Sequence, residues 1–298
     1  MERKFSIVIP IAPWRNPEIL KSIKKLDYPK KSFEVIVEKG TNPSENRNNG
    51  VKKAKGEYTV FLDDDATIEK DYLKKIENFF KEYPEADIVG GPQLTPEEKG
   101  FFARISGIVL TSIFGAFTVR KRYSKGKDVE RADETLLTSA NWCEKKGIYE
   151  KIGGFDKRLF PGEDPERISR AKKNNLNIFY NPEMIIYHRR RQTFFSFCKQ
   201  FFKYGLVRPK KEKIAGETRF IFLIPMLFTI YFMFLPFLSA INLIFLIPIF
   251  FYIILAVLFS IIDSIKNKTL SALPILPFLY LLMHLSYGFG MAIGYLKK

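Results

Sequence analysis

The feature that most constrains the fold of this chain is a long stretch without any charged side chain. It runs from Phe220 to Ile262, about forty residues, and a second uncharged run covers Ala272 to Leu296. A helix needs about twenty apolar residues to cross a bilayer, and the core of a soluble domain does not need runs of this length. We therefore expect residues 214–298 to form a transmembrane region of about three helices, over 219–239, 241–262 and 272–296.

Positive charge is concentrated before these runs. Of the formal net charge of +16, about +13 belongs to residues 1–215, because five basic and two acidic side chains follow them. Segment 186–213 carries nine Lys and Arg residues against one acid, Glu212. Such a cluster beside a span attracts anionic membrane lipid and stays on the cytoplasmic side, and its position argues against nucleic acid as the partner. We predict a multi-pass protein of the cell membrane with a cytoplasmic domain over 1–213, whose part 186–213 is a basic juxtamembrane, interfacial helix.

The first hundred residues alternate between strand and helix patterns joined by short loops. This alternation predicts an α/β domain with a mainly parallel sheet, and ligands of such sheets bind beyond the carboxyl ends of the strands. Those ends carry Pro10-Ile11-Ala12, Glu38-Lys39-Gly40 and Asp63-Asp64-Asp65. The expected strands are 4–9, 34–37, 58–62 and 86–89, and the expected helices are 17–25, 45–53 and 68–83.

The middle of the chain is less regular. Within residues 101–131, segments 105–110 and 113–117 are apolar but interrupted, and we expect them to form an amphipathic element lying against the membrane. A helix is expected over 165–174 and a strand over 178–180. Residues 193–204 place five phenylalanines among lysines, which suits a helix in the plane of the membrane interface, with a helix packed under the sheet as the alternative.

The acidic triplet Asp63-Asp64-Asp65 is the strongest indication of chemistry. It follows a hydrophobic strand-like run, so the carboxylates emerge where the strand leaves the core. Three adjacent acids repel one another unless a positive group lies between them. Mg²⁺ or Mn²⁺ would meet that need while also binding a diphosphate. The alternative is a solvated acidic turn that caps a helix starting near Ile68.

Several motifs in order resemble those of a family 2 glycosyltransferase of GT-A fold. They are Phe5-Ser6-Ile7-Val8-Ile9-Pro10, Arg47-Asn48-Asn49-Gly50, Phe61-Leu62-Asp63-Asp64-Asp65, Gly153-Gly154-Phe155-Asp156 and Gly162-Glu163-Asp164. Tyr187-His188 and the run from Gln200 to Gly205 extend the likeness to the membrane-attached branch that builds polysaccharides and lipid-linked glycans. The resemblance implies a nucleotide-diphospho-sugar transferase domain, with a Rossmann-like mixed sheet, followed by transmembrane helices.

The same resemblance implies roles for the acidic residues. Asp63 would contact the ribose or the metal, and Asp65 would ligate the Mn²⁺ or Mg²⁺ that bridges the sugar diphosphate. Asp164 would be the base that takes the proton from the acceptor hydroxyl, and Glu163 would orient it, although both acids could instead cap the helix that follows. His188 is either a further metal ligand or a buried structural histidine.

The remaining expected contacts are spread along the chain. The resemblance assigns nucleotide-sugar binding to Pro10, Ile11, Glu38, Arg47, Asn48, Asp63 and Asp64, and contact with the diphosphate or the acceptor to Asn141, Arg190, Arg191 and Gln200. Where the family commonly has an aspartate pair after its second strand, this chain has Glu38-Lys39-Gly40, so the nucleotide base is left open. His284 lies in an apolar run and is expected to pack between helices or to lie at the membrane interface.

The predicted function is an inverting, metal-dependent glycosyltransferase. It would move a sugar from a nucleotide-sugar donor to a lipid-linked acceptor, either polyprenyl phosphate or a lipid-linked glycan, at the cytoplasmic membrane face. Three apolar spans offer few polar residues for a polymer channel, so one or a few additions are expected. A non-catalytic membrane scaffold that retains the fold and a nucleotidyltransferase are the alternatives. The side of the membrane on which the C-terminus lies stays open, since Lys297 and Lys298 conflict with a full final crossing.

Overall fold

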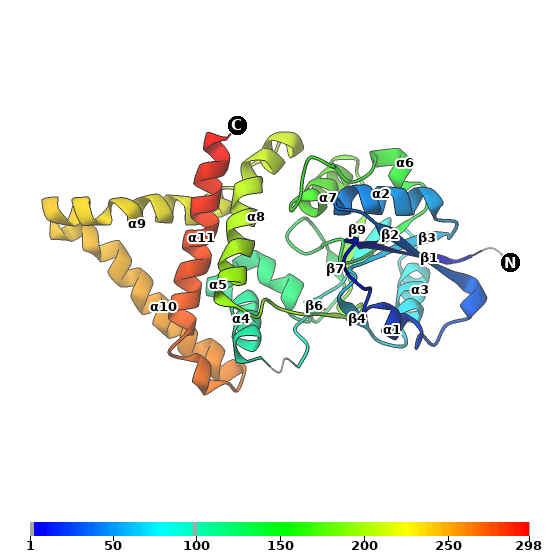
Figure 1. Cartoon of the computed structure of the whole chain (residues 1–298), viewed down its shortest axis with the longest axis horizontal. Coiled ribbons are helices and arrows are strands. Elements are labelled where there is room, and N and C mark those ends of the chain that lie inside the picture. The colour runs from blue at the N-terminus through cyan, green and yellow to red at the C-terminus, as the bar shows by residue number, and fades with distance from the viewer. Residues whose placement is uncertain (1–2, 98–99, 298) are drawn as a thin grey trace. The chain divides into compact units, whose positions relative to one another are not determined.

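The computed structural model describes residues 3–97 and 100–297. The chain divides into two compact units, and both are assembled from separate stretches of sequence (Figure 1). The first unit comprises Met1–Pro96 and Lys121–Arg189, and the second comprises Glu97–Arg120 and Arg190–Lys298. The boundary expected after residue 213 separates a cytoplasmic domain from a transmembrane region, which is a different division from these two compact units. It stays a prediction.

A seven-stranded sheet with the order β2-β1-β3-β8-β5-β9-β7 forms the centre of the first unit. Strand β1 (Phe5–Ile11) lies between β2 (Phe33–Lys39) and β3 (Tyr58–Leu62) and runs parallel to both. Helix α2 (Pro43–Lys53) connects β2 to β3. The expected strand–helix alternation is thus confirmed for this half of the sheet.

The other half of the sheet is mixed. Strand β8 (Asn141–Lys145) is antiparallel to both β3 and β5 (Ile88–Gly90). Beyond β5, strand β9 (Ile178–Tyr180) is parallel to it, and β7 (Glu130–Arg131) closes the edge in the antiparallel direction. The mixed sheet that the resemblance implied is thus confirmed: β8 and β7 run against the other five strands, and the sequence pattern did not reveal β8 between β3 and β5.

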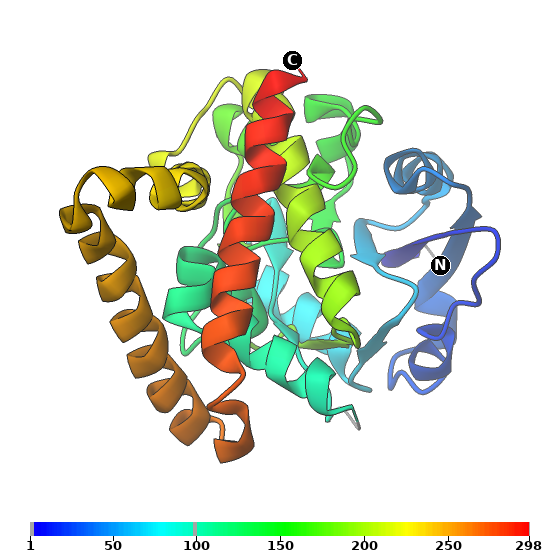
Figure 2. The same ribbon diagram turned by 60° about the vertical axis from the view of Figure 1, so that its left-hand side comes forward.

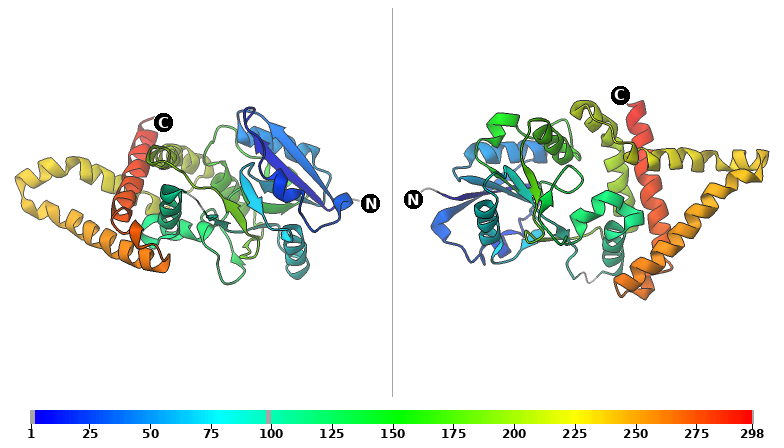
Figure 3. Two further views of the ribbon diagram at one scale, coloured as in Figure 1. Left: turned by 60° about the horizontal axis from the view of Figure 1, so that its bottom comes forward. Right: turned by 180° about the vertical axis from the view of Figure 1, so that it is seen from behind.

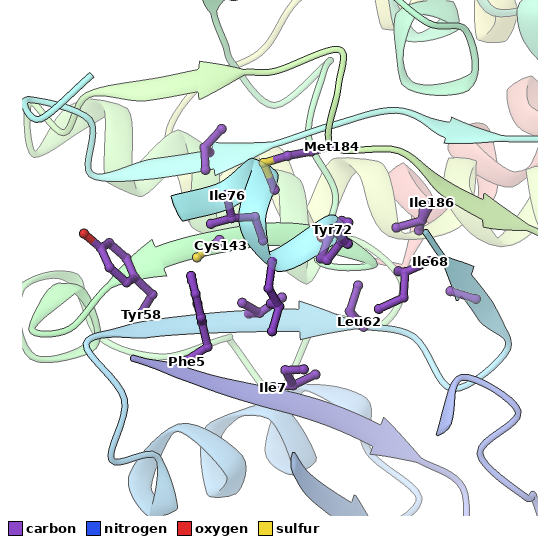
Figure 4. Close-up of a cluster of buried hydrophobic side chains, with 14 of the residues drawn as sticks. Phe5, Ile7, Tyr58, Leu62, Ile68, Tyr72, Ile76, Cys143, Met184 and Ile186 are labelled. Atoms are coloured by element: carbon purple, nitrogen blue, oxygen red, sulfur yellow. The ribbon is translucent and has the colours of Figure 1, made fainter. Parts of the chain in front are cut away.

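Hydrophobic side chains alternate along the strands and build one core on each face of the sheet. Figure 4 shows the core that includes Phe5, Ile7, Tyr58 and Leu62. On this face the sheet is covered by α1 (Leu20–Ile23) and α3 (Tyr72–Glu82), while α2, α6 (Ile148–Ile152) and α7 (Glu163–Lys173) lie on the opposite face (Figure 1). The second core contains Val8, Phe61, Trp142, Phe155 and Ile168.

A second, three-stranded sheet lies next to the carboxyl end of β3. Its order is β4-β10-β6, with β4 (Ala66–Ile68) antiparallel to β10 (Ile186–His188) and β6 (Gln93–Leu94) parallel to β10. The helix expected over 68–83 therefore begins later, at Tyr72, because Ile68 is a strand residue paired with Ile186. Helix α1 is also shorter than the expected 17–25.

The second unit is helical. It contains α4 (Phe101–Thr111), α5 (Ile113–Ala116), α8 (Phe194–Ala215), α9 (Ile224–Ile241), α10 (Ile247–Lys266) and α11 (Leu276–Leu296). Three segments, 220–241, 243–266 and 276–296, are long and apolar enough to cross a membrane. Helices α4 and α5 bend by 66° at their junction and could form a fourth, broken span.

Helices α8 and α11 lie side by side (Figures 2 and 3). Glycines allow their backbones to approach closely, because a Cβ atom at Gly205 would lie 2.0 Å from the carbonyl oxygen of Tyr287, and one at Gly290 would lie 2.1 Å from that of Phe202. Gly290 and Gly294 form the small-xxx-small spacing typical of close helix pairs in membranes. The expected interfacial segment 193–204 is thus the first part of a longer helix that packs against α11.

The last carbonyls of a helix have no partner within it, and those of Phe114 and Gly115 at the end of α5 face His284. Nε2 of His284 lies 3.1 Å from the carbonyl oxygen of Phe114, and Nδ1 lies 2.9 Å from the hydroxyl of Tyr252. Polar side chains of neighbouring helices are the usual partners for such freed groups in an apolar surrounding. His284 therefore packs between helices of this unit, as expected from its place in an apolar run.

Candidate active site

The acidic triplet forms the turn between two sheets. Strand β3 ends at Leu62 and β4 begins at Ala66, so Asp63, Asp64 and Asp65 span the crossing from one sheet to the other. The backbone of the turn is fixed by hydrogen bonds from the amide of Ala66 to the carbonyl of Asp63 (3.2 Å) and from that of Ile19 to the carbonyl of Asp64 (3.0 Å). The carboxylates are thus held by backbone that cannot move freely.

His188 reaches the triplet because of strand register. It pairs with Ala66 across the antiparallel β4–β10 ladder, directly beside the triplet. Its Nε2 atom lies 3.1 Å from Oδ1 of Asp65 and 3.6 Å from Oδ2 of Asp63. The other ring nitrogen, Nδ1, donates to the carbonyl of Arg189 at 3.2 Å. This second bond directs Nε2 towards the two carboxylates.

Asp63, Asp65 and His188 have the composition of a cation site. Each offers one ligand atom, and all three atoms lie within 4.8 Å of one another. Carboxylate oxygens and a neutral imidazole nitrogen, with its second nitrogen fixed by a carbonyl, form a suitable donor set for Mn²⁺ or Mg²⁺. The residues present therefore fit a divalent cation.

The pKa values of this cluster are set by burial and by the charges of its neighbours. Burial would lower the pKa of His188, but Asp63 and Asp65 outweigh it and raise that pKa to about 9. Burial would likewise raise the pKa values of Asp63 and Asp65, yet His188 and the neighbouring arginines bring both below their usual value. The pKa of Asp64 is raised to about 6, first by burial and then by the charge of Asp65. Without a cation, the triplet depends on nearby positive side chains.

Arg15 is one of these side chains, and it was not identified from the sequence. It lies in the loop after β1, where a turn is closed by its amide bonding to the carbonyl of Ala12 (3.0 Å). Nη2 lies 2.8 Å from Oδ2 of Asp65, and Nε lies 3.0 Å from Oδ2 of Asp64. The available signal was that Arg15 carries the only charge between Ile9 and Glu18.

Arg47 connects the triplet to the second acidic pair. It lies on α2 with its side chain almost fully buried. Nη2 lies 3.0 Å from Oδ1 of Asp63, and Nη1 lies 2.9 Å from Oε1 of Glu163. Its Nε atom is buried with no acceptor among the described residues. Burial and the adjacent Asp164 raise the pKa of Glu163, although Arg47 acts in the opposite direction.

Asp164 lies in the first turn of α7, next to Glu163. It accepts a hydrogen bond from the hydroxyl of Ser139, a residue that the sequence did not single out. Helix α7 is fixed by a buried ion pair in which Arg167 contacts both carboxylate oxygens of Glu144 on β8. The placement of Glu163 and Asp164 thus depends on the strand that the sequence pattern did not reveal.

Other predicted site residues make structural contacts. The side-chain amide of Asn48 donates to the carbonyl of Phe155 at 2.9 Å and accepts from the backbone amide of Phe155 at 2.8 Å. Asn141 is fully buried, donates to the carbonyls of Pro92 and Met184, and accepts from the hydroxyl of Tyr72. Their binding roles stay predictions.

The remaining residues predicted to bind the nucleotide-sugar or the acceptor substrate lie in separate parts of the chain. Pro10 and Ile11 lie buried at the end of β1, where the carbonyl of Ile11 accepts from the amide of Gly40 (3.0 Å), and Glu38 pairs with Lys53 (2.6 Å). Arg190, Arg191 and Gln200 belong to the second unit, in which Arg191 donates to Gln200 (3.1 Å). The structure therefore assembles Asp63, Asp64, Asp65, His188, Arg47, Glu163 and Asp164 in the first unit.

Comparison with known proteins bears on the family of this chain. The description "Glycosyl transferase family group 2" belongs to a family model that matches residues 58–293. The poly(ribitol-phosphate) beta-N-acetylglucosaminyltransferase TarS of Staphylococcus aureus is 32% identical over 27% of this chain, a region that spans only 19% of TarS. A crystal structure of S. aureus TarS matches with a TM-score of 0.49 and 18% identity, over 71% of this chain and 42% of that chain.

One solved structure is similar in fold. The mannosyltransferase PcManGT from Pyrobaculum calidifontis, in complex with GDP-Man and Mn²⁺, has a TM-score of 0.50 and 15% identity, over 74% of this chain and 66% of that one. At such identity the likeness concerns the fold alone, and it agrees with the GT-A arrangement of the mixed sheet. Because the family model covers most of the chain, this protein belongs to glycosyl transferase family group 2.

Proposed function

We propose that this chain is an inverting glycosyltransferase that transfers a sugar from a nucleotide-sugar donor to a lipid-linked acceptor at the cytoplasmic face of a membrane. One observation carries the proposal. Asp63, Asp65 and His188 converge at the end of β3, and Arg47 joins this cluster to Glu163 beside Asp164. A cation bound at this cluster and a base at Asp164 would then belong to one connected set of side chains.

The balance of charge favours a divalent cation. Five carboxyl groups, those of Asp63, Asp64, Asp65, Glu163 and Asp164, meet three cationic side chains, those of Arg15, Arg47 and His188. When bound at Asp63, Asp65 and His188, Mn²⁺ or Mg²⁺ would stabilise the charge that develops on the departing nucleoside diphosphate. Asp64 would contact the donor, since its Oδ2 atom is buried without an aligned hydrogen-bond donor in the described part of the chain.

Asp164 is the proposed base. The hydroxyl of Ser139 fixes one of its oxygens, which leaves the other oxygen to take the proton from the acceptor hydroxyl as that hydroxyl attacks the sugar. Burial and the adjacent Asp164 raise the pKa of Glu163, so Glu163 holds a proton more readily than a free glutamate does. Glu163 and Arg47 are positioning residues in this scheme.

The acceptor is proposed from the helical unit. Three segments are suited to cross a membrane, and the region 186–213 before them is rich in Lys and Arg. A lipid-linked acceptor, either polyprenyl phosphate or a lipid-linked glycan, would be presented at that surface, and anionic lipid would hold the basic helix there. Arg190, Arg191 and Gln200 are proposed to contact the phosphate of the acceptor.

The donor nucleotide is proposed as a class only. TarS structures have been solved with UDP and UDP-GlcNAc, and the P. calidifontis mannosyltransferase with GDP-Man. Glu38 stands where the resemblance places the acid that reads the base, at the end of β2. UDP-sugars and GDP-sugars are therefore both donors to test, with Mn²⁺ as the cation.

The test is a transfer assay with the full chain in detergent, radiolabelled UDP- or GDP-sugars, and either polyprenyl phosphate or a lipid-linked glycan as the acceptor. The proposal predicts label in the extracted lipid, and a loss of at least about 100-fold in Asp164→Asn. Asp27→Asn, which alters an exposed pair with Lys74, is the matched control. Absence of lipid product from folded wild-type protein with every donor would contradict the proposal and favour a non-catalytic scaffold.

A further inference from the structure

We propose that Arg15, which pairs with Asp64 and Asp65 in the free protein, competes with the cation for Asp65 and moves to the diphosphate of the donor when the cation binds. This inference rests on the proposed function and adds a donor-binding residue to it. It concerns residues of the first unit alone.

The contacts of Arg15 are those of a substitute cation. Its guanidinium approaches two carboxylates at once, with Nη2 2.8 Å from Asp65 and Nε 3.0 Å from Asp64. Asp65 is also a member of the three-residue cation cluster, so Arg15 and a cation would compete for the same carboxylate. Two positive charges sharing one carboxylate repel each other, which favours the departure of the group held less firmly.

Arg15 is held less firmly than the other cationic groups of the site. Its side chain is 43% exposed, whereas that of Arg47 is 5% exposed and that of His188 is 21% exposed. The contact with Asp64 is also incomplete, because Oδ2 of Asp64 receives no aligned hydrogen bond within the described ranges. Solvent screens the ion pairs of a guanidinium that is this exposed, so little opposes the release of Arg15.

The position of the loop indicates where the guanidinium goes. Arg15 follows β1 at the carboxyl end of the parallel strands, the side on which ligands of such sheets bind. The loop is fixed at both ends, by the pairing of β1 and by the bond between the amide of Ile19 and Asp64. Only the long side chain therefore needs to move. Guanidinium groups bind phosphate oxygens bidentately, and a donor diphosphate beside the cation supplies them.

Two binding measurements on detergent-purified full chain test this inference. The first titrates Mn²⁺ alone, with free Mn²⁺ detected by electron paramagnetic resonance. The second titrates UDP and GDP at saturating Mn²⁺ by calorimetry. Arg15→Gln should bind Mn²⁺ about 3-fold more tightly, because a competitor is removed, and should bind the nucleoside diphosphate about 10-fold more weakly.

Arg3→Gln is the matched control. The side chain of Arg3 is 44% exposed and pairs with Glu34 near the amino-terminal end of the same strand, so its replacement should change neither affinity. Arg15→Lys should lie between wild type and Arg15→Gln for the diphosphate, since Lys keeps the charge but not the bidentate geometry.

Arg15→Gln is expected to raise the affinity for Mn²⁺ and to lower the affinity for the nucleoside diphosphate, and a purely structural role would not change the two affinities in opposite directions. Unchanged or weaker Mn²⁺ binding in Arg15→Gln would show that Arg15 does not compete with the cation, and unchanged diphosphate binding would show that it does not reach the donor. Either result would overturn the inference about Arg15. The proposed function would still stand if the wild type bound the nucleoside diphosphate only in the presence of Mn²⁺. A wild type that bound neither probe would overturn both.

Discussion

Nη2 of Arg47 lies 3.0 Å from Oδ1 of Asp63, and this contact ties the acidic turn after β3 to helix α2. The same guanidinium reaches Glu163 through Nη1 at 2.9 Å and lies over the ring of Phe155. Two acidic motifs that are a hundred residues apart in sequence therefore share one buried cation. Arg47 was predicted to bind the nucleotide-sugar donor. In the structure it also links Asp63 to Glu163, a contact that the sequence spacing does not reveal.

Replacing Arg47 should destabilise the protein. Arg47→Gln leaves Asp63 and Glu163 without their buried hydrogen-bond donor, and a lost hydrogen bond to a charged group costs about 1.5–3 kcal/mol. Arg47→Lys should cost less, because one of the two carboxylates keeps a partner. Thermal unfolding in detergent measures both, with Arg3→Gln as an exposed control expected to cost less than about 1 kcal/mol. An Arg47→Gln protein as stable as the wild type would show that the bridge is not formed.

The Glu144–Arg167 pair should behave as a unit. Its side chains are at most 2% exposed, so Glu144→Gln or Arg167→Met alone leaves a buried charge and should cost about 3–5 kcal/mol. The double variant leaves neither charge and should be more stable than the sum of the single effects predicts. A double-mutant cycle by thermal or denaturant unfolding measures the coupling. Additive effects would contradict the direct contact between β8 and α7.

The stability of the metal-free protein should fall at alkaline pH. The pKa of His188 is raised to about 9 in the folded protein from an ordinary value of 6.5, so the folded state holds this proton more tightly than the unfolded state does. The resulting stabilisation is complete below about pH 6.5 and is lost as the pH rises through about 9. Thermal unfolding from pH 6 to 9.5 should show this loss, and His188→Gln should reduce it. An identical pH profile in the variant would rule out the pairing with Asp63 and Asp65.

Ser139 should affect turnover and leave donor binding unchanged. Its hydroxyl donates to Asp164, and a hydrogen bond to a charged group contributes about 1.5–3 kcal/mol. Ser139→Ala should therefore lower the transfer rate about 10-fold, while Mn²⁺-dependent nucleoside diphosphate binding stays at the wild-type level. Steady-state transfer and calorimetry measure the two properties. A variant that transfers sugar at the full rate would show that Asp164 does not depend on this contact.

Larger residues at the close helix contact should disrupt the helical unit. A Cβ atom at Gly205 or Gly290 would lie within 2.1 Å of a backbone carbonyl oxygen of the other helix, so Gly205→Val or Gly290→Val requires α8 and α11 to separate. We expect a lower thermal midpoint in detergent. Gly100→Ala is the control, since the nearest atom to its added Cβ is 3.8 Å away. Unchanged midpoints for both valine variants would contradict the direct packing of the two helices.

The parts of the fold that were predictable from sequence are those whose pattern is local. Strands β3 and β9 lie where their apolar runs predicted, and the segments long enough to span a membrane match the uncharged runs closely. The family motifs also predicted that Asp63, Asp65 and Glu163-Asp164 belong to one domain. These features depend on periodicity and on charge, both of which the sequence displays directly.

The features that escaped prediction depend on partners distant in sequence. Strand β8 reads Asn-Trp-Cys-Glu-Lys, and the polar residues Asn141 and Glu144 do not fit the pattern of a buried strand. They are buried because Tyr72 and Arg167, which are distant in sequence, bond to them. Arg15 is one arginine in a loop, and only the fold places it on Asp64 and Asp65.

The most direct test of the central claim is the effect of Mn²⁺ on nucleotide binding, measured by thermal shift on detergent-purified protein with UDP, GDP and their sugar conjugates. We predict that one nucleotide raises the thermal midpoint only when Mn²⁺ is present, and that Asp65→Asn abolishes this shift. A nucleotide shift that is unchanged without Mn²⁺ or in Asp65→Asn would contradict the cation site at Asp63, Asp65 and His188. Folded protein that shows no shift with any nucleotide would contradict the proposed transferase.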